Sequence, residues 1–547
     1  LSEYNRYRRE HTRRDDPRQG TLVAFISHAL IRQQAAIGLP DDFFERLLVQ
    51  GRSCILLLDG LDEVANERER QQVSLAVENL AHNAGAGRIV VTSRTRAYQG
   101  RAVLPEEFRV AEVQPMTPEQ VNALAARWCS AVYDEMEAQR ETQRLQGEID
   151  TLEQVRQARG GERLVDAPLL VTIVAIVHYN QRRLPEERAE LYEKCVEVLL
   201  TDSHHPATEA TFELADWGGP LSEKRSLLAF VAYQMMSAGQ EAGRSVGESQ
   251  LTAWLRPRVA SKWGEDQAEE EMAKFIQAVR ERGSLLTTDQ GGDYRFIHLA
   301  FQEFLCAYYL AESVREVDRM VGFLVDKGRI ADSWWRETVL LLVGYLGLKS
   351  QETALTLVRQ LAVLDASPVA SLAGVELAGV GLLELDSHDA PTQSLIVQRL
   401  VEGVANSSLA LSPPLRAAAG VALGRLGDPR HGVGVQDGRP AIDWIDVEPA
   451  PFLMGSAKGE EKYPDELPQF TCTLIRQPYR ISRFPITVLQ YRAFVDADGY
   501  GQQRFWTLAG WQWRQKERIV GPRASGGVYQ TANHPQVGVS WYEAVAF

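Results

Sequence analysis

Short apolar strands alternate with helical patterns in the first 200 residues of the chain. Residues 54–58 form a continuous apolar run, and residues 88–93 form a second, β-branched run. Between them, residues 67–81 place apolar side chains at helical spacing. Runs that are apolar on both faces are typical of parallel strands buried between layers of helices. The pattern predicts a β-strand–helix–β-strand unit within an α/β domain.

The pattern from about residue 200 to 435 is almost wholly helical, with one interruption. Residues 284–296 combine two short strand patterns around a glycine pair, which predicts a hairpin. A hairpin beside helices is typical of a winged helix. Beyond it, short and closely spaced helices indicate stacked antiparallel pairs, as in an α-solenoid. These helices are predicted at residues 334–346, 352–363, 369–385, 395–404 and 414–426.

The residue composition of the chain changes near residue 430. Glycine and proline interrupt residues 430–442, which predicts a linker. The remaining residues, 443–547, are rich in aromatic side chains and predict a loop-rich α+β domain with an aromatic core. Its predicted elements are strands at 451–456, 479–487 and 534–541 and a helix at 488–495.

The amino-acid composition and net charge limit the kinds of protein that this chain can be. The 547 residues are 45% hydrophobic and 24% charged, which is ordinary for a globular chain of several domains. The net charge of −14 argues against general nucleic-acid binding. The five cysteines form no CxxC pair and lie in or near apolar stretches, so we expect reduced thiols and a cytoplasmic location. The longest apolar run, residues 167–177, is too short to span a membrane, so no membrane partner is expected.

Three carboxylates follow the first predicted strand: Asp59, Asp62 and Glu63. Ligands bind at the carboxyl edge of open α/β sheets. One carboxylate there can hold Mg²⁺ beside nucleotide phosphates, and a second can orient a water molecule for attack on the γ-phosphate. The alternative is that Asp59 starts a turn and Glu63 only favours a helix N-terminus. Arg94 follows the second strand and either senses a phosphate or only caps loop carbonyls.

Two motifs carry a family resemblance here. The segments LLLDGLDEVA and IVVTSRTRAY resemble the NACHT NTPase domain of the STAND class of signalling ATPases. The resemblance implies ATP or ADP with Mg²⁺ as cofactors. It further implies that Asp59 is the Mg²⁺ carboxylate, that Asp62 or Glu63 polarises water and that Arg94 senses phosphate.

The same resemblance continues downstream to about residue 312. The segment DAPLL, which contains Pro168, looks like the family's NPLLL segment, whose proline packs near the adenine. The segment YRFIHLAFQEFL resembles the family's FxHxxFQEF signature. By this resemblance His298 contacts the β-phosphate of ADP and holds the closed state. The alternative for His298 is an ordinary buried histidine.

One required motif of that family is missing from the chain. The phosphate-cradling P-loop, GxxxxGK[ST], does not occur before Asp59, and the first lysine of the whole chain is Lys194. Residues 1–4 look like the family's segment just after its second strand. We therefore expect a fragment that is truncated at both ends, with ATP hydrolysis only in the intact protein.

The C-terminal region resembles a second family. The segments FLMGS, DELP, ISRFPITVLQYRAFV and HPQVGVSWYEAVAF resemble, in order, the formylglycine-generating enzyme (sulfatase-modifying factor) family, a variant of the C-type lectin fold. Val488 stands where the family usually has Asn. The family's redox cysteine pair and its copper lie further downstream, so copper is expected only if those cysteines exist. Cys472 is expected in the core. By the resemblance, many relatives keep the fold without the cysteines, and some act as ligand-binding, lectin-like modules.

These observations predict a multidomain chain. The expected parts are an N-terminally truncated NACHT P-loop NTPase core at 1–115, a NACHT helical domain at 116–200, a winged-helix region at 201–312, HEAT-like helical repeats at 313–430, a linker at 431–442 and the first half of a formylglycine-generating-enzyme-like domain at 443–547.

The expected function is a nucleotide-dependent signalling switch in bacterial conflict, defence or ligand sensing. Its solenoid and C-terminal domain would sense a ligand or protein, and the protein would form homo-oligomers on activation. The alternative is an oxidoreductase that acts on cysteine or a small thiol and is regulated by the NACHT module.

Overall fold

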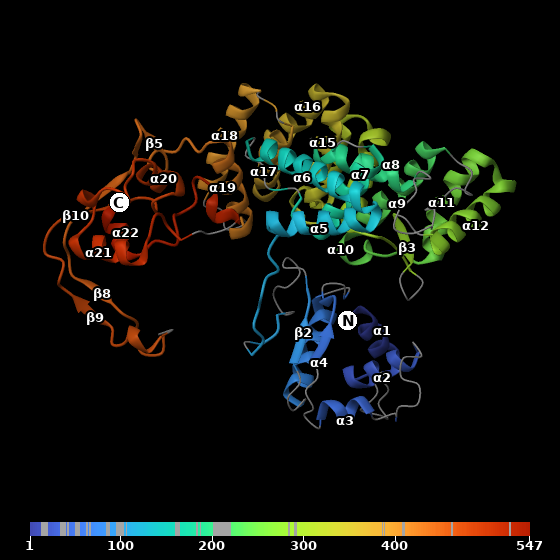
Figure 1. Cartoon of the computed structure of the whole chain (residues 1–547), viewed down its shortest axis with the longest axis horizontal. Coiled ribbons are helices and arrows are strands. Elements are labelled where there is room, and N and C mark those ends of the chain that lie inside the picture. Colours follow the sequence, from blue (N-terminus) through green and yellow to red (C-terminus); the bar gives the residue numbers. More distant parts are fainter. Residues whose placement is uncertain are drawn as a thin grey trace. The chain divides into compact units, whose positions relative to one another are not determined.

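The structure is a computed structural model of the chain (Figure 1). Its contacts divide the chain into two compact units. The first contains residues 1–143, 165–176 and 196–302, and the second contains 144–164, 177–195 and 303–547. The described residues are 1–11, 20–32, 40, 43–49, 55–61, 64, 67–83, 88–93, 103–105, 107–158, 163, 165–181, 184–185, 187–200, 220–282, 285–288, 293–385, 387, 389–406, 411–460, 463–523 and 527–547.

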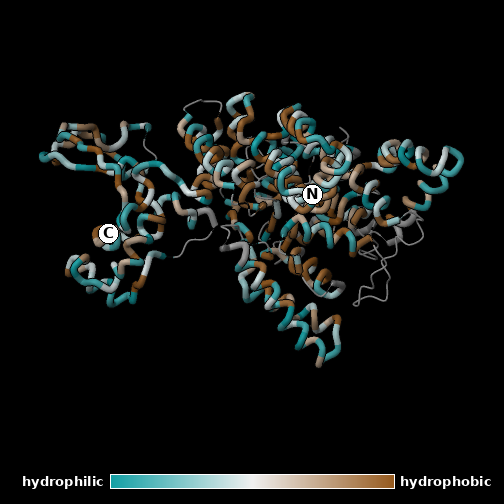
Figure 2. Tube along the Cα trace, turned by 90° about the horizontal axis from the view of Figure 1, so that it is seen from above, coloured by the Kyte–Doolittle hydropathy of each residue, from teal (hydrophilic) through white to brown (hydrophobic). Residues whose placement is uncertain are grey.

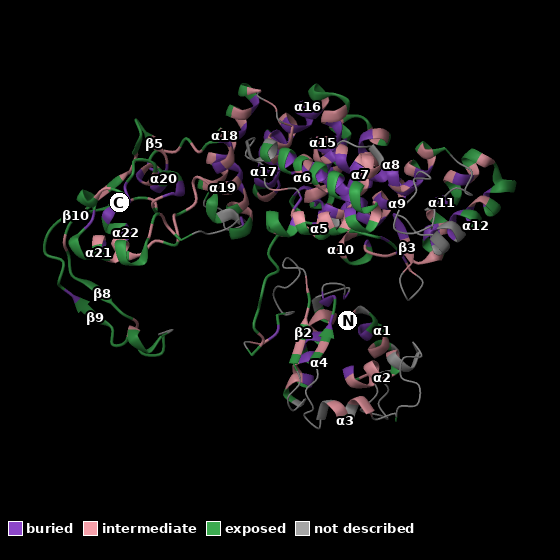
Figure 3. Cartoon of the chain, viewed as in Figure 1, coloured by how far each residue is buried: buried purple, intermediate pink, exposed green. Residues whose placement is uncertain are grey.

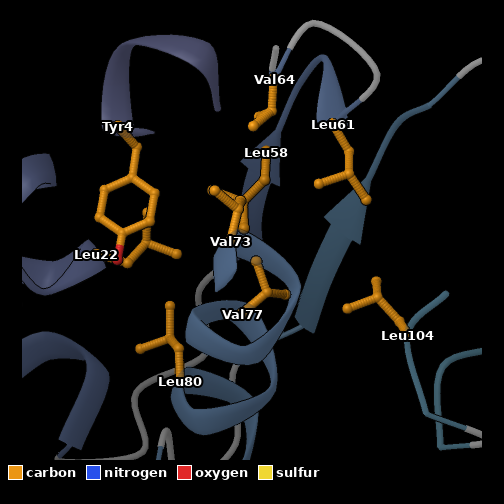
Figure 4. Close-up of a cluster of buried hydrophobic side chains, with 9 residues drawn as sticks. All are labelled: Tyr4, Leu22, Leu58, Leu61, Val64, Val73, Val77, Leu80 and Leu104. Atoms are coloured by element: carbon orange, nitrogen blue, oxygen red, sulfur yellow. The ribbon is translucent and has the colours of Figure 1, made fainter. Parts of the chain in front are cut away.

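A parallel strand pair with a connecting helix starts the first unit, as predicted. Strand β1 (Ile55–Leu58) pairs in parallel with β2 (Arg88–Val91), and α4 (Glu67–Asn83) connects them. The helix buries Val73 and Val77 completely against the strands (Figure 4). The helices before β1 are α1 (Ser2–His11), α2 (Leu22–Arg32) and α3 (Phe43–Val49).

The prediction that both faces of this sheet are buried is wrong for the described residues. Leu58 belongs to the core cluster shown in Figure 4, but Ile55 is 65% exposed and Leu57 is 73% exposed. Val90 on β2 is also exposed. The strands are apolar on both faces, yet the described residues form a core on one face only.

Helices and one hairpin form the rest of the first unit. The helix α11 packs against α9 and α12, and α12 contacts β3, which pairs with β4 as the predicted hairpin. Tyr294 on β4 is completely buried and makes a further bridge to Val246. The elements are α5 (Pro118–Val132), α9 (Leu221–Ser237), α10 (Gly239–Ala242), α11 (Glu248–Trp263), α12 (Glu265–Arg282), β3 (Leu286–Thr288) and β4 (Tyr294–Phe296).

Among the described helices, four contribute residues to both units. They are α6 (Glu135–Ala158), α7 (Pro168–Gln181), α8 (Arg188–Leu200) and α13 (Leu299–Tyr309).

Packed helices form the first part of the second unit, and all five helices predicted beyond the hairpin are present. The helix α17 contacts α15, α16, α18 and α19 and is buried along most of its length (Figure 3). Hydrophobic and hydrophilic positions alternate along the helices (Figure 2). The elements of this part are α8 (Arg188–Leu200), whose first eight residues belong to this unit, η4 (Leu310–Val314), α14 (Val317–Val325), η5 (Asp326–Ala331), α15 (Arg336–Lys349), α16 (Gln351–Ala362), α17 (Pro368–Glu384), α18 (Ala390–Ala405) and α19 (Pro413–Leu426).

Ion pairs join α8 to two of these helices within the second unit. The guanidinium of Arg188 lies 2.7 Å from a carboxylate oxygen of Glu337 on α15 and 3.9 Å from one of Glu384 on α17. Arg336 pairs in the same way with the buried Glu376 at 2.6 Å. The Arg188 pairs therefore connect segments that lie about 150 to 200 residues apart in the chain.

The C-terminal part is an α+β domain with an aromatic core, as predicted. The core cluster contains Tyr491, Phe494, Tyr500 and Trp506. The strand pairs β5–β6, β7–β10 and β8–β9 are all antiparallel. The elements are β5 (Val435–Gln436), β6 (Arg439–Pro440), β7 (Trp444–Val447), β8 (Phe452–Met454), η6 (Pro464–Glu466), β9 (Phe470–Cys472), β10 (Tyr479–Ser482), α20 (Val488–Asp496), η7 (Gln503–Phe505), α21 (Leu508–Glu517), η8 (Gly527–Gln530) and α22 (Trp541–Ala546).

The segment predicted as a linker, 431–442, is folded into this domain. It forms the β5–β6 hairpin, and its Val433 is buried. The side chain of Gln490 on α20 donates hydrogen bonds to the carbonyl oxygens of Gly432 and Ala441, at 3.1 and 2.8 Å. The glycines of this segment lie in tight turns. The C-terminal domain therefore starts about ten residues earlier than predicted.

The predicted strand at 534–541 is wrong. This segment makes one isolated bridge, between Thr487 and Pro535, and then starts α22 at Trp541. Two backbone hydrogen bonds hold it to the start of α20: Val488 N–H donates to His534 and Gln536 N–H donates to Ile486, both at 2.8 Å. Its alternating apolar pattern therefore reflects a loop that is bound on one side only.

Candidate functional site

The carboxyl end of the strand pair holds Asp59 in a hydrogen-bonded turn. The Thr92 hydroxyl, directly after β2, donates to the Asp59 carboxylate and accepts a hydrogen bond from Gly60 N–H at 3.0 Å. The backbone of the two strand ends is also paired, because Thr92 N–H donates to Leu58 and Leu61 N–H donates to Thr92. Asp59 is exposed. The turn alternative and the Mg²⁺ role are therefore compatible, since the same turn presents the carboxylate at the sheet edge.

Thr92 is a residue of this edge that the sequence prediction did not single out. Its signal was its position: it is the first polar residue after the second strand, as Asp59 is after the first. Parallel strands in register bring two such positions together. Carboxylate and hydroxyl oxygens are hard ligands of the kind that suit Mg²⁺.

Asp62, Glu63 and Arg94 lie outside the described residues. Their predicted roles at water and phosphate stay predictions.

Pro168 and His298 each lie at the start of a helix. Pro168 is the first residue of α7 and is exposed. His298 precedes α13, and its Nδ1 accepts a hydrogen bond from the N–H of Ala300 at 3.1 Å. This is the geometry of a helix N-cap. His298 is exposed, so the alternative that it is a buried core histidine is wrong.

The candidate residues lie on separate elements. Asp59 follows β1, Pro168 begins α7, and His298 follows the β3–β4 hairpin. The contacts described above join Asp59 and His298 to their own neighbours. The phosphate-binding arrangement that the resemblance implies thus remains a prediction.

A buried hydrogen-bonded chain crosses the aromatic core of the C-terminal domain. The hydroxyls of Tyr491 and Tyr500 lie 3.0 Å apart, and Tyr500 donates to Glu543 at 2.6 Å. The other Glu543 oxygen accepts from Ser540 N–H in a capping box. Burial raises the pKa of Tyr500 well above its ordinary value. Both tyrosines thus stay neutral and support the fold.

The four cysteines within the described residues are structural. Cys129, Cys195, Cys306 and Cys472 are free and buried, and burial raises the pKa of the first three thiols. Cys472 lies on β9, in the core as predicted. Among the described residues, no cluster of three or more His, Cys, Asp and Glu side chains is placed to hold a metal ion. The part of the chain that the structure describes also contains no helix that could cross a membrane.

Two known domain families match the chain. Residues 188–310 match the winged helix-turn-helix domain C-terminal to NACHT. Residues 433–547 match the sulfatase-modifying factor enzyme 1-like domain. The first match begins at α8, inside the predicted helical domain at 116–200, and the second begins inside the predicted linker.

The chain is also similar to three hercynine oxygenases. That of Mycolicibacterium thermoresistibile is 32% identical over 103 residues, which are 18% of this chain and 23% of the relative. Those of Mycobacterium tuberculosis and Mycolicibacterium smegmatis are 36% identical over 80 residues and 31% identical over 96 residues, which are 13% and 17% of this chain. These matches span less than a quarter of the length of each relative. In domain terms, the chain combines a winged helix of the kind that follows NACHT domains with a sulfatase-modifying-factor-like domain.

Proposed function

We propose that the protein is a nucleotide-dependent switch of the STAND type, with ATP or ADP and Mg²⁺ as its ligands. The winged helix that matches the NACHT-associated domain is the observation that carries this proposal. The parallel β1–α4–β2 unit with Asp59 and Thr92 at its carboxyl edge supports it, because this is where α/β sheets bind nucleotides.

In this proposal each candidate residue has a separate role. Asp59 holds Mg²⁺, Asp62 or Glu63 polarises water, Arg94 senses phosphate, Pro168 packs near the adenine and His298 contacts the phosphate of ADP. The oxygen donors Asp59 and Thr92 suit Mg²⁺. The 547 residues contain no GxxxxGK[ST] cradle for the phosphates. We therefore derive no hydrolytic step from these residues.

The helical array between the two matched domains and the C-terminal domain form the sensing end in this proposal. A ligand bound there shifts the population between a closed, ADP-bound arrangement and an open one that assembles into homo-oligomers. The HEAT-like character of the array and a role in bacterial conflict or defence belong to the same proposal.

The test is the nucleotide content of the protein as its own gene encodes it. Protein purified from cells is denatured, and the released nucleotide is identified by chromatography. We expect close to one ADP per chain, with several-fold less in Asp59→Asn and in His298→Ala. Asp150→Asn on the exposed face of α6 and His82→Ala at the end of α4 are matched controls with wild-type content. Wild-type protein that releases no nucleotide and binds neither ADP nor ATP with Mg²⁺ would overturn the proposal.

The second candidate function is oxidation of cysteine or a small thiol by the C-terminal domain, as the resemblance to the formylglycine-generating enzyme family implies. The similarity to proteins named hercynine oxygenase supports an oxidative role of this domain. The resemblance assigns that chemistry to a cysteine pair with copper, and the matched segment contains only Cys472. Because Cys472 is buried, thiol-dependent oxygen uptake by this chain is expected to be absent, with or without added copper. Uptake that is lost in Cys472→Ser would instead favour the enzyme.

A further inference from the structure

A pocket of about 410 Å³ lies beside α20 in the C-terminal domain. One wall comes from α20 and the other from the segment that precedes α22. The described residues that line it are Val488, Tyr491, Arg492, Val495, Pro522, Arg523, Tyr529, Gln530 and Gln536.

Two guanidinium groups line this pocket. Arg492 and Arg523 are both exposed, and within the described part of the chain neither forms an ion pair with a carboxylate. This is notable in a chain with a net charge of −14, in which many other arginines are paired. Arginine presents a planar fork of donors that matches the oxygens of a carboxylate or phosphate group. Two unpaired guanidiniums on one pocket therefore favour an anion.

The rest of the lining is largely apolar or aromatic. Val488, Val495 and Pro522 contribute apolar surface, and Tyr491 and Tyr529 contribute rings. The Tyr491 hydroxyl is engaged by Tyr500, and burial raises the pKa of Tyr491 to about 12. Tyr491 therefore adds no negative charge beside the two arginines.

Backbone contacts hold the second wall in place. Arg523 N–H donates to the Gly538 carbonyl at 2.9 Å. Gly538 has a φ of +74°, and a Cβ at this position would lie 2.6 Å from the Arg523 carbonyl oxygen. The backbone that carries Arg523 is thus fixed against a residue that has to be glycine. A preformed wall lowers the entropy that a ligand must overcome on binding.

We propose that this pocket binds a small molecule that carries a carboxylate or phosphate group on a short apolar or aromatic body. Arg492 and Arg523 bind the oxyanion, and the valines and tyrosine rings contact the body. The assignment rests on the proposed sensing role of the C-terminal domain and gives that role a site and a ligand class.

The site is tested by isothermal titration of the full 547-residue chain without nucleotide. The probes are phenylacetate, phenyl phosphate, inorganic phosphate and the uncharged benzyl alcohol. We expect one of the two aromatic anions to bind at least tenfold more tightly than benzyl alcohol, and binding to weaken with added salt. The preferred anion distinguishes a carboxylate from a phosphate ligand.

Variants assign the binding to the two arginines. Arg492→Gln and Arg523→Gln are each expected to weaken the preferred probe about tenfold or more, because each removes a charge-assisted hydrogen bond. Arg476→Gln, an exposed arginine outside the pocket, should bind like wild type. Both targets are exposed, so thermal unfolding of the variants should match that of wild type.

Three results would overturn the proposal: no probe binds, benzyl alcohol binds as well as the anions, or both arginine variants retain wild-type affinity. None of these results depends on nucleotide, so none of them bears on the switch proposal. Conversely, the absence of bound nucleotide would overturn the switch proposal but would not change the expected result of this titration.

Discussion

Asn533 in the C-terminal domain donates a hydrogen bond from Nδ2 to the carbonyl oxygen of Gly420 on α19, across 2.9 Å. The same amide nitrogen lies 2.9 Å from an Asp428 carboxylate oxygen. Asp428 in turn binds the guanidinium of Arg430, with the closest contact at 2.6 Å. The last helix of the array and the following domain are therefore joined by a polar contact as well as by the chain itself.

Gly424 gives the first prediction. A Cβ on this residue would lie 2.1 Å from Asn533 Oδ1 and 2.7 Å from Thr531 Cγ2, so Gly424→Ala forces the Asn533 segment away from α19. We expect the free energy of unfolding to fall by about 1–3 kcal/mol, as for overpacking in a core, which is measured as a lower denaturant midpoint. Gly420→Ala is the matched control, because nothing lies within 4 Å of its Cβ position. Alanine there should be neutral or slightly stabilising, since it favours the helix. Equal effects of the two substitutions would contradict this contact.

The acid stability of the same contact is the second prediction. Burial opposes ionisation of Asp428, but hydrogen bonds from Arg430 and Asn533 outweigh it and lower the pKa of the carboxyl. An unfolded aspartate titrates at about 3.9. The stabilisation is therefore fully present above that pH and is lost as the pH falls through the lower pKa of the folded state.

Asp428→Asn measures this dependence. The difference in unfolding free energy between wild type and variant should be constant from about pH 7 to pH 5 and shrink below about pH 4. Asp365→Asn, on an exposed aspartate, is the control and should give a small difference at every pH. A wild-type–Asp428→Asn difference that grows on acidification would be inconsistent with the lowered pKa.

The ion pair of Arg188 supports a third prediction. Burial lowers the pKa of the Arg188 guanidinium, but the charges of Glu337 and Glu384 outweigh it and raise the pKa above its ordinary value. Because Arg188→Met removes a charge-assisted hydrogen bond, we expect the free energy of unfolding, measured with urea, to fall by about 1.5–3 kcal/mol. Arg319→Met breaks an ion pair whose two side chains are both mostly exposed and should cost less than about 1 kcal/mol. Similar costs for the two substitutions would refute a special role of the α8 contact.

His298 allows its two roles to be separated, which is the fourth prediction. Its Nδ1 caps α13, and asparagine is also a good N-cap. Thermal unfolding should therefore be near wild type for His298→Asn, while His298→Ala loses about 1 kcal/mol. If the imidazole also contacts ADP, both variants lose nucleotide. Retention of nucleotide by His298→Asn would limit His298 to capping.

Local elements were predictable where apolar spacing and secondary structure agree. The β1–α4–β2 unit followed from two apolar runs around a helical period, and the β3–β4 hairpin from its glycine turn. The helix starts were also predictable, as the N-caps Ser350, Ser367 and Ser412 show. Each serine side chain accepts a hydrogen bond from the backbone N–H three residues later in the chain.

Properties that depend on distant partners were not predictable. The glycine-rich composition of 431–442 predicts a linker, but Gly432 and Gly438 have positive φ and lie in turns, and the Gln490 side chain donates to the carbonyl of Gly432. Likewise, Arg492 and Arg523 come from segments 31 residues apart and share a pocket only after folding. Arg492 lies in the segment ISRFPITVLQYRAFV and Arg523 lies outside the quoted segments, so no spacing rule pairs them.

The Arg188 contacts also bear on how the protein can be divided for experiments. The matched winged-helix segment starts at residue 188, but the carboxylates that neutralise this arginine lie at Glu337 and Glu384, beyond the segment's end at 310. A protein cut at those homology limits would leave this arginine without its two acidic partners. A piece that contains Arg188 should therefore extend past Glu384, so that the arginine keeps both carboxylates.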